Sequence, residues 1–291
     1  MKRARNQMIL SMAIFGTLAP FVRCISVSSG ELALYRAVLA AVLIGAWLLL
    51  TRQMVPFGAI RRQLPLLLAS GVAMGINWIL LFEAYRYTTV SVATLSYYFA
   101  PVLVTAACPF LFRERLTLKQ AVCFVMSTLG LVLITGASGM GESGTDHLGI
   151  LFGLGAAVFY ASVILLNKFI RGVEGIHRTF VQFLAAILTL IPYVALTGGV
   201  TLGGLDGPGW VCLLIVGLVH TGVTYCLYFS ALKELPGQKA AILSYIDPLT
   251  AVLVSVLVLR ESISLWQAVG GALILGFTLW NEISPPVRAK S

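Results

Sequence analysis

The sequence predicts an all-α polytopic membrane protein with ten transmembrane helices, arranged as two inverted five-helix repeats. The first observation is composition: of 291 residues, 59% are hydrophobic and 11% are charged, with a mean hydropathy of +0.95. A soluble domain carries about 25% charged residues, so most of this surface is not expected to face water. The second observation is that the apolar residues form runs of about 20, the length of a membrane-spanning helix. The third is an internal repeat.

The repeat relates residues 80–122 to residues 227–269 at a constant offset of 147 residues, and no gap interrupts either stretch. The same offset aligns Glu114 with Glu261, and it also pairs Arg86 with Lys233, a match of like charge. Chance agreement over such a length is improbable, so the repeat describes the architecture. Identical residues at this offset include Phe82 and Phe229, Ala84 and Ala231, Tyr98 and Tyr245, Pro101 and Pro248, Arg113 and Arg260, and the Gln-Ala-Val triplets at 120–122 and 267–269.

The ten expected helices follow the apolar runs in chain order. The first run begins after the basic head at Lys2 and continues through Thr17, Pro20 and Phe21, which favours an uncleaved span over a signal peptide. Pro285 ends the last helix because proline does not continue it. The expected spans are residues 7–25, 31–51, 64–84, 90–111, 118–137, 148–169, 177–197, 209–230, 239–259 and 264–283.

Lysine and arginine predict the orientation, because cytoplasmic loops carry an excess of both. With the N-terminus in the cytoplasm, four of the 20 Lys and Arg residues fall in the outer half: Arg23, Arg36, Arg86 and Arg260. Both termini are therefore expected in the cytoplasm, and the protein in the cytoplasmic (inner) membrane. The net charge of +9 is then explained by cytoplasmic loops, and no nucleic acid is expected as a partner.

The domain organisation follows from the repeat. We expect the first five-helix repeat at residues 1–137, the second at 148–284, and an outer Gly-rich linker at 138–147. Because five is odd, the second repeat crosses the membrane in the opposite sense to the first. Inverted repeats are typical of alternating-access transporters, whose substrate site lies near mid-membrane between the repeats.

The repeated residues also form a known pattern. The first copy carries Ala84, Tyr87-Thr88, Pro101, the segment 113–116 and Gln120. At these residues the chain resembles the EamA module of the drug/metabolite transporter (DMT) superfamily, and the resemblance covers nearly the whole chain as two modules. It implies ten helices, cytoplasmic termini and a central cavity between the halves. It leaves the substrate open, because the family moves amino acids, other metabolites, nucleotide precursors and drugs. The second copy carries Ala231, Pro248, Glu261, Ser262 and Gln267 in the same places.

Asp247 is the sharpest candidate for a substrate-binding or coupling residue. It is expected near mid-depth and directly precedes Pro248, which frees a backbone carbonyl and disfavours helix at the preceding residue. Such an irregular turn is tolerated in a membrane where it lines a cavity or is buried in protein. A carboxylate there would bind an amine or take a proton, and the alternative is an Asp that satisfies the freed backbone or a neighbouring Tyr. Its counterpart in the first copy is Ala100, so the site is asymmetric.

His220 is the second candidate, for lining the cavity or handling protons. It shares one helical face with Thr224 and Tyr228, and Thr224 is the counterpart of Asn77. The alternative is a hydrogen-bonded packing histidine. The aromatic and polar residues Asn77, Trp78, Tyr97, Tyr98, Ser244 and Tyr245 would supply the walls and handles of a small-molecule site.

Several other residues have competing readings. Arg36 either recognises a carboxylate or snorkels outward. Glu83 and Arg86 are spaced to pair across a helical turn. Glu261 and its counterpart Glu114 are interpreted as structural residues, with a cap on the next helix as one role. Pairs of glycines at 71 and 75, and at 149 and 153, permit close helix contact, which we expect inside the protein rather than at a dimer face.

The leading functional interpretation is a secondary transporter, and more specifically an exporter, of a small metabolite such as an amino acid or related compound. Protons are a candidate coupling ion through Asp247 or His220, whereas facilitated diffusion needs neither. The chain contains no GxxxxGK[ST] loop, so ATP hydrolysis is not expected to drive it. The alternative is an exporter of cationic drugs or other toxic compounds. The expected partners are the small-molecule substrate and the lipid bilayer, and the sequence leaves monomer or homodimer open.

Two further functional classes, an intramembrane protease and a non-transporting receptor, have less support in the sequence. An intramembrane protease would use Ser138, in the GxSG form of residues 136–139, with His220 as base, but Ser138 is expected in a glycine-rich outer loop. No enzyme activity is therefore expected. A non-transporting receptor would not need polar groups in mid-membrane. The five cysteines lie in or beside apolar runs without a CxxC pair, and no metal or cofactor is expected.

Overall fold

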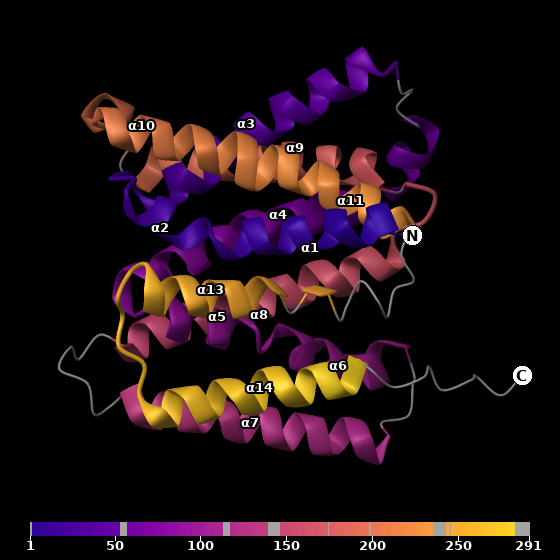
Figure 1. Cartoon of the computed structure of the whole chain (residues 1–291). Coiled ribbons are helices and arrows are strands. Elements are labelled where there is room, and N and C mark those ends of the chain that lie inside the picture. The colour runs from indigo at the N-terminus through magenta and orange to yellow at the C-terminus, as the bar shows by residue number, and fades with distance from the viewer. Residues whose placement is uncertain are drawn as a thin grey trace, which may run out of the picture.

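The computed structural model is helical, and its described residues contain no β-strand (Figure 1). The helices lie roughly parallel and antiparallel to one another, so that their ends gather at two opposite ends of the molecule. The structure describes residues 2–52, 57–112, 117–138, 146–173, 175–197, 199–234, 243–244 and 246–282.

The helices fall into two sets in chain order. The first set is α1 (Lys2–Gly16), α2 (Leu18–Arg23), α3 (Ser29–Leu50), α4 (Phe57–Tyr87), α5 (Val90–Tyr97), α6 (Ala100–Phe112) and α7 (Leu118–Ser138). The second set is α8 (Asp146–Phe169), α9 (Gly175–Thr197), η1 (Leu202–Gly204), α10 (Gly207–Leu214), η2 (Ile215–Val223), α11 (Thr224–Glu234), α13 (Ile246–Leu257) and α14 (Leu265–Glu282).

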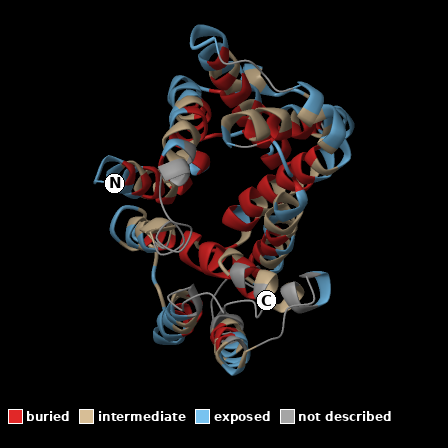
Figure 2. Ribbon diagram, turned by 90° about the vertical axis from the view of Figure 1, so that its right-hand side faces the viewer, coloured by how far each residue is buried: buried red, intermediate tan, exposed pale blue. Residues whose placement is uncertain are grey.

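Within the described residues, five helical segments are long and apolar enough to cross a membrane: α3, α4, α8, α9 and the continuous segment Gly207–Tyr228. Four shorter apolar segments coincide with the expected fourth, fifth, ninth and tenth spans, at Val90–Val104, Ala121–Leu133, Ile246–Leu257 and Leu265–Trp280. The expected span 7–25 corresponds to α1 and α2. Many large apolar side chains on these helices are exposed, such as Leu50, Phe110 and Leu196, each by more than 80%. Figure 2 shows exposed residues along the outer sides of the helices. Such a surface suits lipid rather than water.

The described residues show two of the expected spans, 7–25 and 90–111, to be divided, and a proline explains each division. A proline ring clashes with the carbonyl four residues earlier and provides no N–H for a helical hydrogen bond. Helix α1 ends at Gly16, four residues before Pro20, and α5 ends at Tyr97, four residues before Pro101. The sequence predicted continuous helices at both places. The breaks matter because the residues around them reach the centre of the molecule.

The expected span 209–230 contains a π-helical segment, η2, between α10 and α11. Polar side chains within η2 and at the start of α11 contact carbonyls five residues earlier. The hydroxyl of Thr221 donates to Val216 O at 2.8 Å, and that of Thr224 donates to Val219 O at 2.7 Å. π-Helical segments are rare and often mark functional sites, and sequence periodicity did not predict this one.

Packing between the two sets is symmetric. Helix α4 packs on α8 and α9, and its counterpart, formed by α10, η2 and α11, packs on α1 and α3. The pairs α3 with α9 and α7 with α14 join counterparts to each other, and α5 packs on α13, the counterpart of α6. The 147-residue offset holds in these contacts: Gly75 meets Leu190 as its counterpart Gly222 meets Leu43. Figure 1 shows α7 and α14 side by side, with the chain running in opposite directions.

The glycine pairs lie inside the protein, as predicted. A side chain on Gly71 would meet Gln182 and Ala185 of α9, and one on Gly149 would meet Thr88. The glycines therefore allow the helix backbones to approach closely at these crossings. Such packing is common in membranes, where lipid provides no hydrophobic driving force between helices.

Candidate functional site

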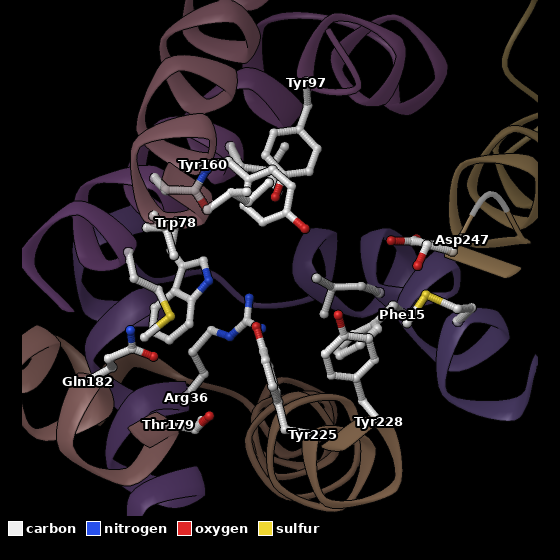
Figure 3. A pocket seen from close by; sticks show the side chains of 18 of the residues that line it. Phe15, Arg36, Trp78, Tyr97, Tyr160, Thr179, Gln182, Tyr225, Tyr228 and Asp247 are labelled. Carbon is white, nitrogen blue, oxygen red and sulfur yellow. The ribbon is translucent and has the colours of Figure 1, made fainter. Parts of the chain in front are cut away.

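A cavity of about 1210 Å³ lies between the two sets of helices (Figure 3). Both sets contribute to its wall: α1 to α6 from the first, and α8, α9, α11 and α13 from the second. The cavity opens to the surface at the end of the molecule where the N-terminus lies, and we call this opening the mouth. The lining residues Gly175 and Ser230 are exposed there, and Trp47 is 51% exposed.

Asp247 faces this cavity from the first turn of α13. The hydroxyl of Tyr98 donates to its Oδ2 at 2.6 Å. Tyr98 directly follows α5, so the break before Pro101 places this tyrosine opposite the helix start that precedes Pro248. The two prolines are counterparts in the repeat, and together they bring a phenol and a carboxylate into contact. The structure therefore places Asp247 on the cavity wall, within the first turn of α13 and bonded to a tyrosine, and its role in binding or coupling stays a prediction.

Arg36 also faces the cavity, from α3, and only 3% of its surface is exposed. Its Nε donates to the hydroxyl of Thr221 at 3.1 Å. The guanidinium carbon lies 4.7 Å from the ring centre of Trp78 and 5.3 Å from that of Phe82, within the range of cation–π attraction. The sequence left two readings of this residue open, and the structure excludes snorkelling toward the surface.

Aromatic side chains form most of the wall around these two charges. The rings of Tyr97 and Tyr160 lie 5.1 Å apart, and those of Phe15 and Tyr225 lie 5.2 Å apart. Tyr228 lies 6.5 Å from Phe15. An apolar and aromatic wall with few polar groups is typical of small-molecule sites.

The structure brings most of the predicted site residues together. Asn77 lines the cavity and donates to Ala156 O at 2.6 Å, so part of its amide holds α4 against α8. Tyr245 lies outside the described residues. The predicted residues that line the cavity are Asn77, Trp78, Tyr97, Tyr98, Tyr228, Ser244 and Asp247.

His220 and Thr224 are buried in or beside η2, behind the cavity wall rather than on it. The Nε2 of His220 lies 3.1 Å from the hydroxyl of Thr17, and its ring lies 5.0 Å from that of Phe21. His220 therefore connects η2 to the break between α1 and α2. Its functional role remains a prediction.

Sequence reasoning missed several wall residues. Tyr225 is the counterpart of Trp78 at the 147-residue offset, so applying the repeat outside the best-matching stretch would have found it. Tyr160 and Gln182 line the cavity as well, but no motif marks either residue.

Polar contacts close the end opposite the mouth. Glu261 pairs with Arg23 (Nη1 to Oε1, 2.5 Å) and accepts the backbone N–H of Val90 at 2.9 Å. It also accepts the hydroxyl of Ser255, which in turn accepts that of Ser91 at 2.8 Å. We call these five residues the closing network.

The closing network corrects the interpretation of Glu261 as a cap on the next helix. Glu261 caps α5 of the other repeat, whereas the following helix α14 begins with a capping box in which Ser264 and Gln267 bond each other's backbone N–H. Its counterpart Glu114 lies outside the described residues.

The predicted pair of Glu83 and Arg86 is present at 3.6 Å, with half of the arginine side chain exposed.

Comparison with known proteins decides the family. The model of the EamA-like transporter family matches residues 7–136 and again residues 147–281. The chain belongs to the EamA-like transporter family. It is therefore a multi-pass membrane protein of the transporter type, and the family is part of the DMT superfamily.

Three relatives illustrate the similarity of this EamA-family chain to other proteins. The "Uncharacterized transporter YxxF" of Bacillus subtilis (strain 168) is 30% identical over 270 residues, which cover 92% of this chain and 86% of the relative. An "Uncharacterized transporter" of Archaeoglobus fulgidus is 31% identical over 202 residues, or 68% of this chain and 70% of that one. The "Uncharacterized inner membrane transporter YhbE" of Escherichia coli (strain K12) is 24% identical over 250 residues, or 84% and 67%.

A solved crystal structure shares the fold. It superposes with a TM-score of 0.66 over 94% of each chain at 19% sequence identity. At this identity the likeness concerns the fold alone.

Proposed function

We propose that this protein is a secondary transporter that exports a small metabolite, such as an amino acid or related compound, across the cytoplasmic membrane by alternating access. In this proposal ten spans form two inverted five-helix repeats, with α1 and α2 as one span and α5 and α6 as another. The symmetric packing of the two sets, and the opposite directions of α7 and α14, support inversion.

One observation carries the proposal: a cavity between the repeats is open at one end and closed at the other. Its open end is lined by exposed residues, whereas Arg23 and Glu261 pair at the opposite end. Alternating access requires this asymmetry, because a transporter must expose its central site to one side at a time.

The proposed direction of transport is supported by the orientation that we assign. The excess of Lys and Arg favours a cytoplasmic location for the N-terminal end. The cavity opens at that end, so this is the conformation in which an exporter takes up its substrate. The source of energy is proposed to be an ion gradient or the substrate's own gradient, and no enzymatic step is part of the cycle.

A second candidate is export of cationic drugs or other toxic compounds. The carboxylate of Asp247, together with the faces of Tyr97, Tyr160, Tyr225 and Tyr228, favours it. Aromatic rings and a carboxylate together bind organic cations. This candidate assigns no role to Arg36.

The test is efflux from proteoliposomes that contain the purified full chain. Vesicles are loaded with a mixture of amino acids, nucleobases, sugars and organic cations, and the compounds that leave are identified by mass spectrometry with and without an imposed pH gradient. At least one compound is expected to leave faster than from protein-free vesicles. Asp247→Asn should slow its efflux, whereas the matched control Leu196→Ala, at a side chain 87% exposed outside the cavity, should not. Equal efflux of every compound from vesicles with and without the protein would refute the transporter proposal.

A further inference from the structure

Arg36 has more hydrogen-bonding capacity than its protein surroundings use. Its Nε donates to Thr221, but its two Nη groups have no acceptor among the described residues. No described carboxylate pairs with it either, since the ion pairs of the described chain join Arg23 to Glu261 and Arg86 to Glu83. Figure 3 shows the guanidinium reaching into the cavity beside Trp78 and Tyr225. The unused donors therefore face the space where a ligand would lie.

An unpaired charge at this depth needs a reason. Taking a guanidinium out of water costs free energy that the faces of Trp78 and Phe82 offset only in part. Charged side chains inside membrane spans generally face a cavity and mark the path of a substrate or ion. A planar guanidinium with two free Nη groups fits a carboxylate through two parallel hydrogen bonds.

Repeat symmetry singles out the same residue. At the 147-residue offset the counterpart of Arg36 is Phe183, and the counterpart of Trp78 is Tyr225. The ring centre of Phe183 lies 5.5 Å from that of Trp78 and 5.4 Å from that of Tyr225, so these residues form one cluster across the repeat interface. The fold accepts an aromatic residue at this position in one repeat. A charge in the other is therefore not required by the architecture.

Asp247 departs from the symmetry in the same way, because its counterpart is Ala100. Away from the mouth, these two residues are the charged groups that line the cavity in the described chain. They lie on opposite sides of it in Figure 3, and no described ion pair joins them. A ligand with an amine alone would leave Arg36 uncompensated, and a ligand with a carboxylate alone would face Asp247.

We propose that Arg36 binds the carboxylate of the transported compound while Asp247 binds its amine, so that the transporter selects amphoteric compounds that carry both groups. This inference rests on the proposed transport function and replaces its cationic alternative. The aromatic wall accommodates the apolar remainder of the compound.

The competing explanation is structural: Arg36 fixes η2 by its bond to Thr221. The two explanations differ in what happens to the protein without ligand. A structural arginine would lower the melting temperature when it is replaced. A ligand-binding arginine that is buried without a partner should leave the melting temperature unchanged or raise it, because its replacement removes the desolvated charge.

The experiment compares matched compounds that differ only in their charged groups. Each standard amino acid with a primary amine is tested with its decarboxylated amine and its deaminated acid, for example phenylalanine, phenethylamine and 3-phenylpropanoate. Binding to the purified full chain is measured from the shift of the melting temperature with concentration. The variants are Arg36→Gln, Arg36→Lys and, as a matched control, Arg62→Gln, which replaces an exposed arginine outside the cavity.

We expect one or more amino acids to bind the wild type more tightly than the corresponding amine and acid. Arg36→Gln should weaken that binding about tenfold or more, as for the loss of a charge-assisted hydrogen bond, and should bring the amino acid and its amine to the same affinity. Arg36→Lys should fall between, because it keeps the charge without the planar pair of donors. Arg62→Gln should match the wild type.

Three results would overturn the inference. The first is binding of amines that equals that of the amino acids and persists in Arg36→Gln, which would leave the transporter intact with Asp247 alone as its anchor. The second is a lowered melting temperature of ligand-free Arg36→Gln with unchanged preference among the three compound types. The third is absence of binding across the whole panel. Efflux in the proteoliposome assay separates these failures from failure of the transport proposal itself.

Discussion

Arg23 and Glu261 form an ion pair between the two repeats, with Arg23 Nη1 2.5 Å from Glu261 Oε1. Arg23 is the last residue of α2, and Glu261 lies between α13 and α14. The carboxylate also accepts from Val90 at the start of α5, so three segments meet at one side chain. Glu261 is 10% exposed in its side chain, which makes this contact stronger than an ordinary surface pair.

Replacing Glu261 should therefore shift the protein toward a state that is open at the other end. Glu261→Gln keeps the size of the side chain but removes the charge that Arg23 and the N–H of Val90 bind, at a cost of about 1–3 kcal/mol. The measurement uses Thr94→Cys, placed at a buried residue of the cavity wall, in an otherwise cysteine-free chain. A membrane-impermeant maleimide added from outside should label this cysteine faster in Glu261→Gln.

The matched control for this labelling is Glu83→Gln. Glu83 pairs with Arg86 at 3.6 Å, but half of that arginine side chain is exposed, and such pairs contribute about 0–1 kcal/mol. The control should label at the rate of the parent. If Glu261→Gln also labels at the parent rate, the closing network does not hold this end shut.

Asp247 and Tyr98 lead to a prediction about transport. Asp247→Asn retains the shape of the side chain and an oxygen for the hydroxyl of Tyr98, but removes the charge. We expect transport to fall at least about tenfold, equivalent to ~1.4 kcal/mol, while the melting temperature stays the same or rises. Tyr98→Phe removes one hydrogen bond, worth about 1 kcal/mol or roughly fivefold. Initial efflux rates check both, and wild-type transport by Asp247→Asn would remove this residue from the site.

Gly71 and Gly58 lie in the same helix, α4, and should respond oppositely to alanine. A Cβ on Gly71 would lie 2.5 Å from Gln182 O and from Ala185 Cβ, so the backbones of α4 and α9 must separate. We expect Gly71→Ala to destabilise the protein by about 1–3 kcal/mol. A Cβ on Gly58 would meet nothing within 4 Å, and alanine favours helix. The melting temperature of Gly58→Ala should therefore equal or exceed that of the wild type. Equal melting temperatures for the two variants would contradict the close packing of α4 on α9.

The sequence was sufficient for the family and for much of the helical order, because long apolar runs and a gapless repeat are strong signals. It also pointed to Asp247, which lies on the cavity wall, because a carboxylate before a proline inside an apolar run has few explanations. The breaks at Gly16 and Tyr97 follow from Pro20 and Pro101 by simple geometry. They were not predicted because the apolar runs continue through them.

Other features depend on contacts between distant segments and have no local signal. The π-helical segment η2 is an example, since its hydrophobic residues fit an ordinary helix. Arg36 is another: its sequence position allows either a surface or a cavity location, and only the packing of α3 against α4 and η2 decides. The partner of Glu261 was missed for the same reason, because Val90 is distant in sequence and belongs to the other repeat.

His220 gives the last prediction, because its surroundings are those of a packing residue. Its Nε2 lies 3.1 Å from the hydroxyl of Thr17, and it is absent from the cavity wall of the described chain. His220→Ala should lower stability by about 1–3 kcal/mol through the lost hydrogen bond and the space left beside Phe21, while substrate affinity stays unchanged. Thr17→Val is the matched partner. If the bond between them matters, the double variant should lose less stability than the two single variants together. Loss of transport driven by a pH gradient in His220→Ala, at an unchanged melting temperature, would instead assign this histidine to proton transfer, the other role that its sequence context allows.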